Sequence, residues 1–291
     1  MMNSKKAVVI GGAGFIGSYT ADELSSRGFE VTIFDCIESP WLSVDQKMIV
    51  GDLLDDDKLA EAVNGCNVVY NFASLCDLEE AQHQPLETAR INVLGNVLVM
   101  EACRQAKVQR YIYASTLYVY SREGGFYRCS KQSAEHYVEQ YQLSYGLDYT
   151  IMRYGSLYGP RSDHRNGLWR IVKHALETES VYYEGSPETM REYIHVEDAA
   201  RASVDVMGEE FRNQHVVLTG LEKIRVYDLL KMLAEIMDLP DSVEFGKSDL
   251  AGHYVRTPYA YQHKMGRKFI PNLHVDLGQG LLELIEEVRN S

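Results

Sequence analysis

The sequence lacks the features that mark exported and membrane proteins. Its five cysteines are odd in number and form no C-x-x-C pair, which favours a reduced, cytoplasmic protein over one held together by disulfides. Only the apolar run 7–10 lies between the polar N-terminus and Gly11, and this run is too short for a signal sequence or a membrane span. We therefore expect no membrane partner.

Positive charge is scarce and metal-binding motifs are missing. Lys and Arg number 29 against 42 for Asp and Glu, so the formal net charge is −13, which argues against a nucleic-acid partner. The nine histidines are scattered and form no H-E-x-x-H motif. The sequence therefore predicts no metal site. It also contains no repeat, no low-complexity tract and no Pro/Ser-rich linker.

The chain does have enough apolar residues for a large core. Its 291 residues, 45% of them hydrophobic, suit one large α/β domain or two coupled lobes. Tyrosine is unusually frequent, with 20 residues against 8 Phe and 2 Trp. Because tyrosine combines apolar area with a polar tip, the excess fits polar binding sites, although packing and sheet propensity explain it more simply.

Short β-rich runs alternate with longer amphipathic runs in the first half of the chain. Strands are predicted at 7–10, 30–34, 48–50, 67–72, 110–114 and 149–153. Helices are predicted at 15–27, 57–63, 86–107 and 130–145. This alternation predicts right-handed βαβ units and an α/β fold with a doubly wound parallel sheet. The last two helices are long enough to offer a face to a partner, so a homodimer built on them is a hypothesis.

A glycine-rich loop follows the first predicted strand and opens the first predicted helix. It reads Gly11-Gly12-Ala13-Gly14-Phe15-Ile16-Gly17. Glycines allow a tight turn and let backbone N–H groups approach a pyrophosphate, which then lies at the positive N-terminus of the helix. With a strand before it and a helix after it, the loop predicts a dinucleotide site.

Two carboxylates at later strand ends bear on the identity of the cofactor. Asp35 ends the second predicted strand, about 18 residues beyond Gly17, where it can bind the adenosine ribose and repel a 2′-phosphate. No Arg or Lys follows it in 36–38, so the predicted cofactor is NAD rather than NADP. Asp52 and Leu53 follow the third strand and can line the adenine, although an ordinary turn is nearly as well supported.

The pattern changes after 158–161, where polar residues and glycine interrupt it. Strands are predicted at 192–196 and 216–219, both returning to the main sheet, and helices at 168–176, 226–237 and 277–288. We therefore predict two interleaved lobes. Residues 1–156 with about 192–220 form the dinucleotide-binding domain, and about 157–191 with 221–291 form a smaller substrate-binding lobe.

A candidate catalytic group lies in the middle of the chain. Tyr127 and Lys131 are four residues apart at a helix start and share one helix face. Lys131 can therefore lower the pKa of Tyr127 and reach the ribose of a nicotinamide. Ser115 and Thr116 stand upstream at the C-terminal end of the fifth strand, where parallel sheets place their ligands.

These motifs together resemble the extended short-chain dehydrogenase/reductase superfamily, in particular its NAD-dependent nucleotide-sugar epimerases and dehydratases. The resemblance covers nearly the whole chain and implies a Rossmann-type fold, NAD as cofactor and a nucleoside-diphosphate sugar as substrate. Besides the glycine loop, it is carried by the blocks at 51–53, 71–74, 91–96, 113–120, 127–131, 153–161 and 191–198.

The resemblance implies a role for each matching residue. Tyr127 is the base or acid at the sugar hydroxyl, Lys131 is its electrostatic partner, and Thr116 hydrogen-bonds the same sugar oxygen, with Ser115 as the alternative one position earlier. The cofactor-binding residues are Gly11, Gly14, Phe15, Ile16, Gly17, Asp35, Asp52, Leu53, Phe72, Ala73, Ser74, Asn92, Tyr127, Lys131 and Tyr154. Asn92 has an alternative role as a buried, satisfied amide.

Six residues are implied on the substrate side: Cys76, Thr116, Tyr118, Ser156, Arg191 and Arg256. The two arginines would make bidentate contacts with a pyrophosphate, or else be solvated surface residues. His195 lies in a predicted strand among branched apolar residues and is expected to be structural.

Three departures from the family pattern narrow the chemistry. Leu117-Tyr118 stands where the 4,6-dehydratases carry Asp-Glu, which disfavours dehydration. Only 121–126 separates Tyr120 from Tyr127, where relatives have a longer loop. Ser156 stands where many relatives have Asn, and Cys76 stands where some hexose 4-epimerases have Lys, which argues against ordinary UDP-galactose specificity.

The first expectation for function is therefore an NAD-dependent nucleotide-sugar epimerase acting at C4 through a keto-sugar. A nucleotide-sugar 4-dehydrogenase or reductase is close behind, because the same residues serve both reactions. A 4,6-dehydratase and a non-catalytic dinucleotide sensor are less favoured, the latter because Tyr127, Lys131 and Thr116 are all present.

Overall fold

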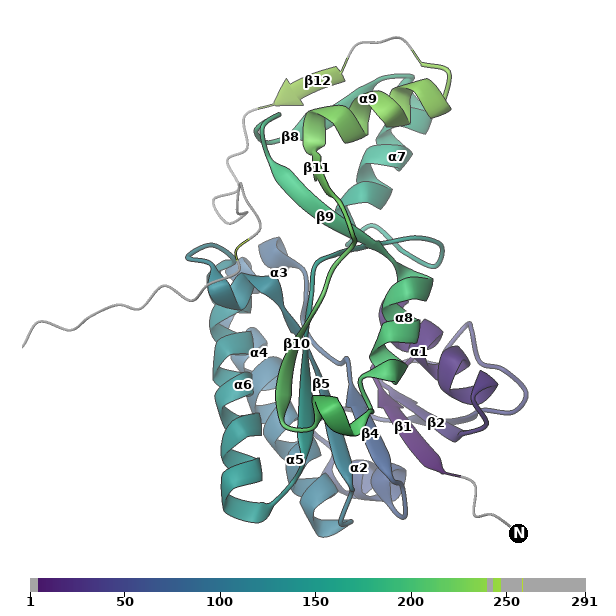
Figure 1. Ribbon diagram of the computed structural model, residues 1–291, viewed down its shortest axis with the longest axis vertical. Coiled ribbons are helices and arrows are strands. Elements are labelled where there is room, and N and C mark those ends of the chain that lie inside the picture. The colour runs from purple at the N-terminus through teal and green to yellow at the C-terminus, as the bar shows by residue number, and fades with distance from the viewer. Residues whose placement is uncertain (1–4, 240–242, 247–257, 259–291) are drawn as a thin grey trace, which may run out of the picture. The chain divides into compact units, whose positions relative to one another are not determined.

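A seven-stranded parallel sheet forms the centre of the fold (Figure 1). The computed structural model describes residues 5–239, 243–246 and 258. The strand order is β10-β6-β5-β4-β1-β2-β3. The chain adds β2 and β3 on one side of β1 and then β4, β5, β6 and β10 on the other side, as in doubly wound folds. The predicted fold class is confirmed. The strands are β1 (Lys6–Ile10), β2 (Glu30–Asp35), β3 (Lys47–Val50), β4 (Val68–Asn71), β5 (Arg110–Thr116), β6 (Tyr149–Tyr154) and β10 (Gln214–Leu218).

Helices cover both faces of this sheet (Figure 1). On one face lie α1 (Phe15–Ser26) and α8 (Val196–Asp205), whose Leu24 and Val204 share a buried cluster with Ile33 of β2. On the other face lie α2 (Asp56–Val63), α5 (Asn96–Gln105) and α6 (Gly125–Tyr145). Because both faces are covered, the interior strand β5 is buried along its whole length, which explains the apolar and aromatic residues 111–114 in its middle.

The predicted helix 86–107 is interrupted, so this prediction was wrong in detail. The segment consists of α4 (Pro85–Ala89), a π-helical turn (Arg90–Gly95, η1) and α5, and it follows a short α3 (Leu78–His83). At Gly95 a Cβ atom would lie 2.4 Å from Cδ2 of Leu53, so the turn brings helix backbone against the core, and a larger residue there would displace the Leu53 side chain. The helix predicted at 130–145 begins at Gly125 instead and includes Tyr127.

The rest of the described chain forms two smaller sheets. One contains β7 (Ser156–Tyr158), β9 (Met190–His195) and β11 (Lys223–Arg225), and the other pairs β8 (Val181–Glu184) with β12 (Val243–Gly246). The helices α7 (Gly167–Thr178) and α9 (Val226–Ile236) share an apolar cluster with β8. Short 3-10 turns are η2 (Leu117–Tyr120) and η3 (Glu209–Phe211). The predicted helix 277–288 lies outside the described residues.

Only one of the two strands predicted to return to the main sheet does so. β10 pairs with β6, as expected, but β9 pairs in parallel with β7 and antiparallel with β11. The prediction that 192–196 joins the main sheet was therefore wrong. A short apolar strand carries no local signal of which sheet it will join, because that depends on partners distant in the sequence.

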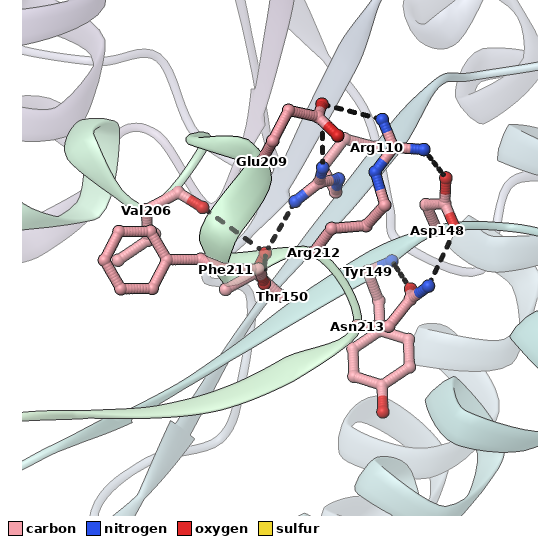
Figure 2. Close-up of polar contacts among 9 residues, drawn as sticks. All are labelled: Arg110, Asp148, Tyr149, Thr150, Val206, Glu209, Phe211, Arg212 and Asn213. Atoms are coloured by element: carbon pink, nitrogen blue, oxygen red, sulfur yellow. Dashed lines mark hydrogen bonds and ion pairs between the residues drawn. The ribbon is translucent and has the colours of Figure 1, made fainter.

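A polar network holds β10 beside β6 (Figure 2). Asn213 has a left-handed φ of +56°, accepts the N–H of Tyr149 at 2.9 Å and donates to Asp148 at 2.9 Å. Arg212 donates to Asp148 at 2.6 Å and to Glu209 at 2.7 Å. These contacts fix the turn before β10, and with it the pairing register of the last strand of the sheet.

Candidate active site

The glycine loop between β1 and α1 has the backbone geometry that a phosphate needs. Gly11 has φ +77°, and a Cβ atom there would lie 2.6 Å from the backbone nitrogen of Ala73. At Gly17 a Cβ atom would lie 2.2 Å from the carbonyl oxygen of Gly11. A side chain at either position would displace backbone. Gly14 precedes the first turn of α1 without a capping side chain, so that end of the helix suits an anion such as a pyrophosphate.

Asp35 lies at the end of β2, beside this loop. Its carboxylate accepts the N–H of Ala13 at 3.0 Å and, more weakly, that of Ile37 at 3.4 Å. The negative charge is thus held next to the loop, where it would repel a 2′-phosphate. Burial, followed by the charge of Asp35, raises the pKa of the Cys36 thiol.

Asp52 and Leu53 occupy different environments. Asp52 is exposed and accepts the N–H of Leu54 at 2.9 Å, which is the contact of an ordinary Asx turn. Leu53 is buried in the core against the π-helical turn. The contact of Asp52 thus matches the alternative of an ordinary turn, although its carboxylate is exposed and could still reach an adenine.

The segment after β4 passes next to the loop. The ring of Phe72 stacks on Tyr70, with the centroids 6.1 Å apart, and tilts against Tyr154 at 6.5 Å. The hydroxyl of Tyr154 is hydrogen-bonded to Ser203 at 2.5 Å. The hydroxyl of Ser74 is buried and has no hydrogen-bond partner among the described residues. A buried polar atom rarely lacks a partner, so Ser74 fits a site that a polar cofactor completes.

The structure brings Tyr127, Lys131 and Thr116 together. Both α6 residues lie in its first two turns, and Tyr127 is hydrogen-bonded to Thr116 at the end of β5. Lys131 donates to the carbonyl of Ala114 at 2.9 Å. Its Nζ lies 4.9 Å from the ring centroid of Tyr113 and 5.8 Å from that of Tyr127.

Ser115 is not part of this group. Its hydroxyl is buried and donates to Glu135 at 2.5 Å, while Thr116 contacts Tyr127. Successive side chains of a strand point to opposite faces, so one of the two hydroxyls must face away from Tyr127. The geometry favours Thr116 as the hydroxyl that acts with Tyr127.

Burial dominates the titration of the reactive pair. It raises the pKa of Tyr127, and nearby Cys76 adds to this rise, while the hydrogen bond with Thr116 opposes it. Burial also lowers the pKa of Lys131 to about 8, against the opposing effects of Cys76 and Glu135. The net effect is a raised pKa of Tyr127 rather than the lowered one expected, because desolvation of the phenolate is the largest of these influences.

Asn92, in the π-helical turn, is a fully engaged amide. Its Oδ1 accepts the N–H of Leu75 at 2.8 Å, and its Nδ2 donates to the carbonyl of Leu75 at 3.0 Å and to Ser130 at 2.9 Å. Both amide hydrogens are used, which matches the buried, satisfied amide rather than a direct cofactor ligand. Asn92 thereby holds the segment before Cys76 against α6.

Cys76 and Tyr118 border the reactive group. The thiol of Cys76 is exposed, yet desolvation by the surrounding protein raises its pKa, while Arg165 and Lys131 oppose the rise. The ring of Tyr118, in η2, meets the ring of Tyr127 edge-on at 6.4 Å.

Three predicted residues lie on the small sheet of β7, β9 and β11. Ser156 pairs with Tyr193 across β7 and β9. Arg191, on β9, is buried and donates to the carbonyl of Met190 at 3.1 Å, so the alternative of a solvated surface arginine is wrong. His195 accepts the N–H of Glu197 at 3.4 Å and caps α8, as expected of a structural histidine. Arg256 lies outside the described residues.

Several charged residues near the site were not predicted. Arg165 follows β7, forms an ion pair with Asp163 at 2.6 Å and acts electrostatically on Cys76. Loop residues such as these have no sequence periodicity that would reveal their position. Glu135 and Arg153 form a buried ion pair behind the reactive group. For Glu135 a signal existed, since it follows Lys131 by four residues on the same helix face.

The residues in the described ranges contain no group of His, Cys, Asp and Glu side chains suited to a metal ion. Within the same ranges, no helix is long and apolar enough to cross a membrane.

Comparison with known proteins decides the family. Residues 7–219 match the model of the NAD dependent epimerase/dehydratase family. The chain belongs to this family. The predicted resemblance to extended short-chain dehydrogenases/reductases is thereby confirmed, and the protein is an enzyme of the NAD-dependent epimerase/dehydratase type.

Individual relatives of this family member act on UDP-sugars. The chain is 26% identical over 299 residues to a UDP-N-acetyl-alpha-D-glucosaminuronate decarboxylase of Bacillus cytotoxicus, covering 94% of this chain and 89% of the relative. It is 24% identical over 271 residues to a UDP-glucose 4-epimerase of Corynebacterium glutamicum, covering 82% of each. The crystal structure of the UDP-glucose 4-epimerase of Thermus thermophilus, a complex with NAD, is similar with a TM-score of 0.76 at 25% identity, covering 88% of this chain and 90% of that one.

Proposed function

We propose that this member of the family is an NAD-dependent nucleotide-sugar epimerase that inverts C4 of the sugar through a keto-sugar intermediate. The observation that carries the proposal is the group formed by Tyr127, Thr116 and Lys131, in which the phenol is hydrogen-bonded to the threonine beside a buried ammonium. The sugar nucleotides named for its relatives support the substrate class.

The residues around the loop suit NAD. The glycine loop and the first turn of α1 would bind the pyrophosphate, Asp35 the adenosine ribose, and the unpartnered hydroxyl of Ser74 a polar group of the cofactor. Lys131 would bind the nicotinamide ribose. Bound NAD would supply reversible hydride transfer with the sugar carbon.

The chain's own residues would handle the proton. Tyr127 takes the proton of the C4 hydroxyl as the carbonyl forms, and Thr116 hydrogen-bonds the same oxygen. Lys131 stabilises the phenolate that results. After the keto-sugar turns its other face, Tyr127 returns the proton, so that the protein ends in the protonation state in which it began.

Among the described residues, the site lacks the acid–base pair that a 4,6-dehydratase needs. A 4,6-dehydratase needs an acid and a base beyond the tyrosine, but Leu117 is a buried hydrocarbon and Tyr118 is a phenol packed against Tyr127. On the substrate side, Cys76, Tyr118 and Ser156 would contact the sugar, and Arg191 would contact the diphosphate. A 4-dehydrogenase or reductase is the alternative, since the same three catalytic residues serve it.

A panel of nucleotide sugars tests the proposal. Purified protein with NAD is incubated with UDP-, dTDP- and GDP-sugars, and the products are identified by NMR while NADH absorbance is followed. A C4 epimer formed at constant NADH supports the epimerase. Stoichiometric NADH with a released keto-sugar shows the dehydrogenase instead, and release of water or of carbon dioxide refutes both.

We also propose that the protein is a cytoplasmic homodimer. On α6, Tyr137, Leu143 and Tyr145 expose 46%, 76% and 59% of their area, and these side chains are where a second copy of the chain would pack. All five cysteines are free, which suits a reducing compartment. Light scattering after size-exclusion chromatography tests the dimer, and a mass near the 33.1 kDa of a single chain would refute it.

A further inference from the structure

A buried ion pair lies directly behind the reactive group. Glu135 of α6 and Arg153 of β6 form a two-pronged contact, with Nε to Oε1 at 3.0 Å and Nη2 to Oε2 at 2.6 Å. Their side chains are only 7% and 14% exposed. The carboxylate also accepts the hydroxyl of Ser115, and the guanidinium donates to the hydroxyl of Tyr120 and lies 4.6 Å from its ring centroid.

Each member of this network adjoins a residue of the proposed active site. Glu135 lies one helical turn beyond Lys131, and Ser115 immediately precedes Thr116. Arg153 immediately precedes Tyr154, which contacts Phe72. Tyr120 closes the η2 turn that carries Tyr118. The network therefore ties together four elements, α6, β5, β6 and η2, at the points where they present reactive or lining side chains.

We infer that Glu135 is a positioning residue of the active site. Held by its two hydrogen bonds from Arg153, it fixes the end of β5 against α6, and it places a negative charge one helical turn from Lys131. This inference rests on the proposed function only in the roles of Lys131 and Thr116. A carboxylate that receives three hydrogen bonds in a dry environment is rigid. It therefore fixes the strand end that carries the Thr116 hydroxyl relative to the helix that carries the Lys131 ammonium.

The charge of Glu135 matters because the other titratable side chains around Lys131 are neutral. Tyr127 comes from the same helix, Tyr113 from β5 and Cys76 from the segment after β4. Burial raises the pKa of each of these three groups, so all of them are neutral near pH 7. Cys76 and Glu135 both oppose the desolvation that lowers the pKa of Lys131, and Glu135 is the one of these two that is anionic near pH 7.

The test is a titration of Lys131 in single-site variants. Lysine side-chain carbons are labelled with ¹³C, the Lys131 signal is assigned by its loss in Lys131→Met, and its midpoint is followed by NMR in the ligand-free protein. In Glu135→Gln the midpoint should fall by about 1 unit, because the opposite charge is removed while the shape is kept. An unchanged midpoint would overturn the inference.

A matched control lies one turn further along the same helix. Glu139 loses the same charge in Glu139→Gln, but it contacts His215 of β10 rather than Arg153. The Lys131 midpoint should stay at its wild-type value in this variant. An equal shift in both variants would show a general effect of net charge and would also overturn the inference.

Further variants separate geometry from charge. Ser115→Ala removes the link to β5 without changing any charge, so it should lower kcat with the Lys131 midpoint and KM unchanged, whereas unchanged kcat would contradict the geometric part. If Glu135→Gln does not fold, Glu135→Asp keeps the charge but withdraws it by one methylene, and a smaller downward shift is expected. A midpoint at the wild-type value in a folded Glu135→Asp counts against the inference.

The titration does not depend on turnover. If no nucleotide sugar is converted by the wild-type protein, the proposed function fails, and the midpoints still decide whether Glu135 acts on Lys131.

Discussion

Replacing Asp35 by alanine should change which dinucleotide the protein prefers. A hydrogen bond to a charged group contributes about 1.5–3 kcal/mol, so losing the contact to the adenosine ribose should weaken NAD binding by about 10- to 100-fold. NADP should lose less affinity or gain some, because the carboxylate that repels its 2′-phosphate is gone. The preference for NAD should therefore fall by about 100-fold. The bond from Ala13 N–H, 3.0 Å long, is also lost.

The assay is calorimetric titration of NAD and NADP into the wild type and two variants. Asp52→Ala is the matched control, because Asp52 is another carboxylate after a neighbouring strand whose observed contact is a local turn at 2.9 Å. Its ratio of the two Kd values should match the wild type. An unchanged ratio in Asp35→Ala, or an equal change in both variants, would refute the role of Asp35 at the ribose. Asp35→Asn, which keeps the shape, separates the loss of charge from any loosening of the loop.

Three further outcomes are expected. Tyr127→Phe should lower turnover by orders of magnitude while NAD affinity stays within a few-fold, and unaltered turnover would exclude Tyr127 as the base. Lys131→Met should abolish turnover yet raise the free energy of unfolding at pH 7 by about 2 kcal/mol. A pKa near 8 in place of 10.5 means that burying the ammonium costs about 3 kcal/mol. The hydrogen bond to Ala114 that the variant loses offsets about 1 kcal/mol of this gain. As pH rises through 8 the folded wild type releases this proton before the unfolded chain does, so wild-type stability rises and the difference should shrink; a difference that grows in urea titrations would contradict this. Asn213→Ala, which breaks two hydrogen bonds at a left-handed residue, should cost about 2 kcal/mol, whereas an unchanged urea midpoint would show that the turn before β10 is held elsewhere.

Local sequence determined the first half of the fold and the identity of the phosphate loop. β1, the loop and α1 follow one another within 6–26, and the steric demand for glycine at Gly17 arises from the nearby backbone of Gly11. At Gly11 the left-handed φ of the turn is local, but the backbone of Ala73 that leaves no room for a side chain is distant in the sequence. Tyr127 and Lys131 share a helix face because of their spacing alone. Such features depend on periodicity and on short-range sterics, and both can be read without knowing the partners.

Tertiary structure decided which side chains meet. Ser115 and Thr116 are equivalent by residue type, and only the packing of α6 on β5 turns one toward Glu135 and the other toward Tyr127. The pairing of β9 with β7 and β11 likewise came from distant partners. The rise in the pKa of Tyr127 is a burial effect, which no spacing reveals. In each case the deciding free energy comes from desolvation and contacts between segments far apart in the sequence, and these exist only once the chain has folded.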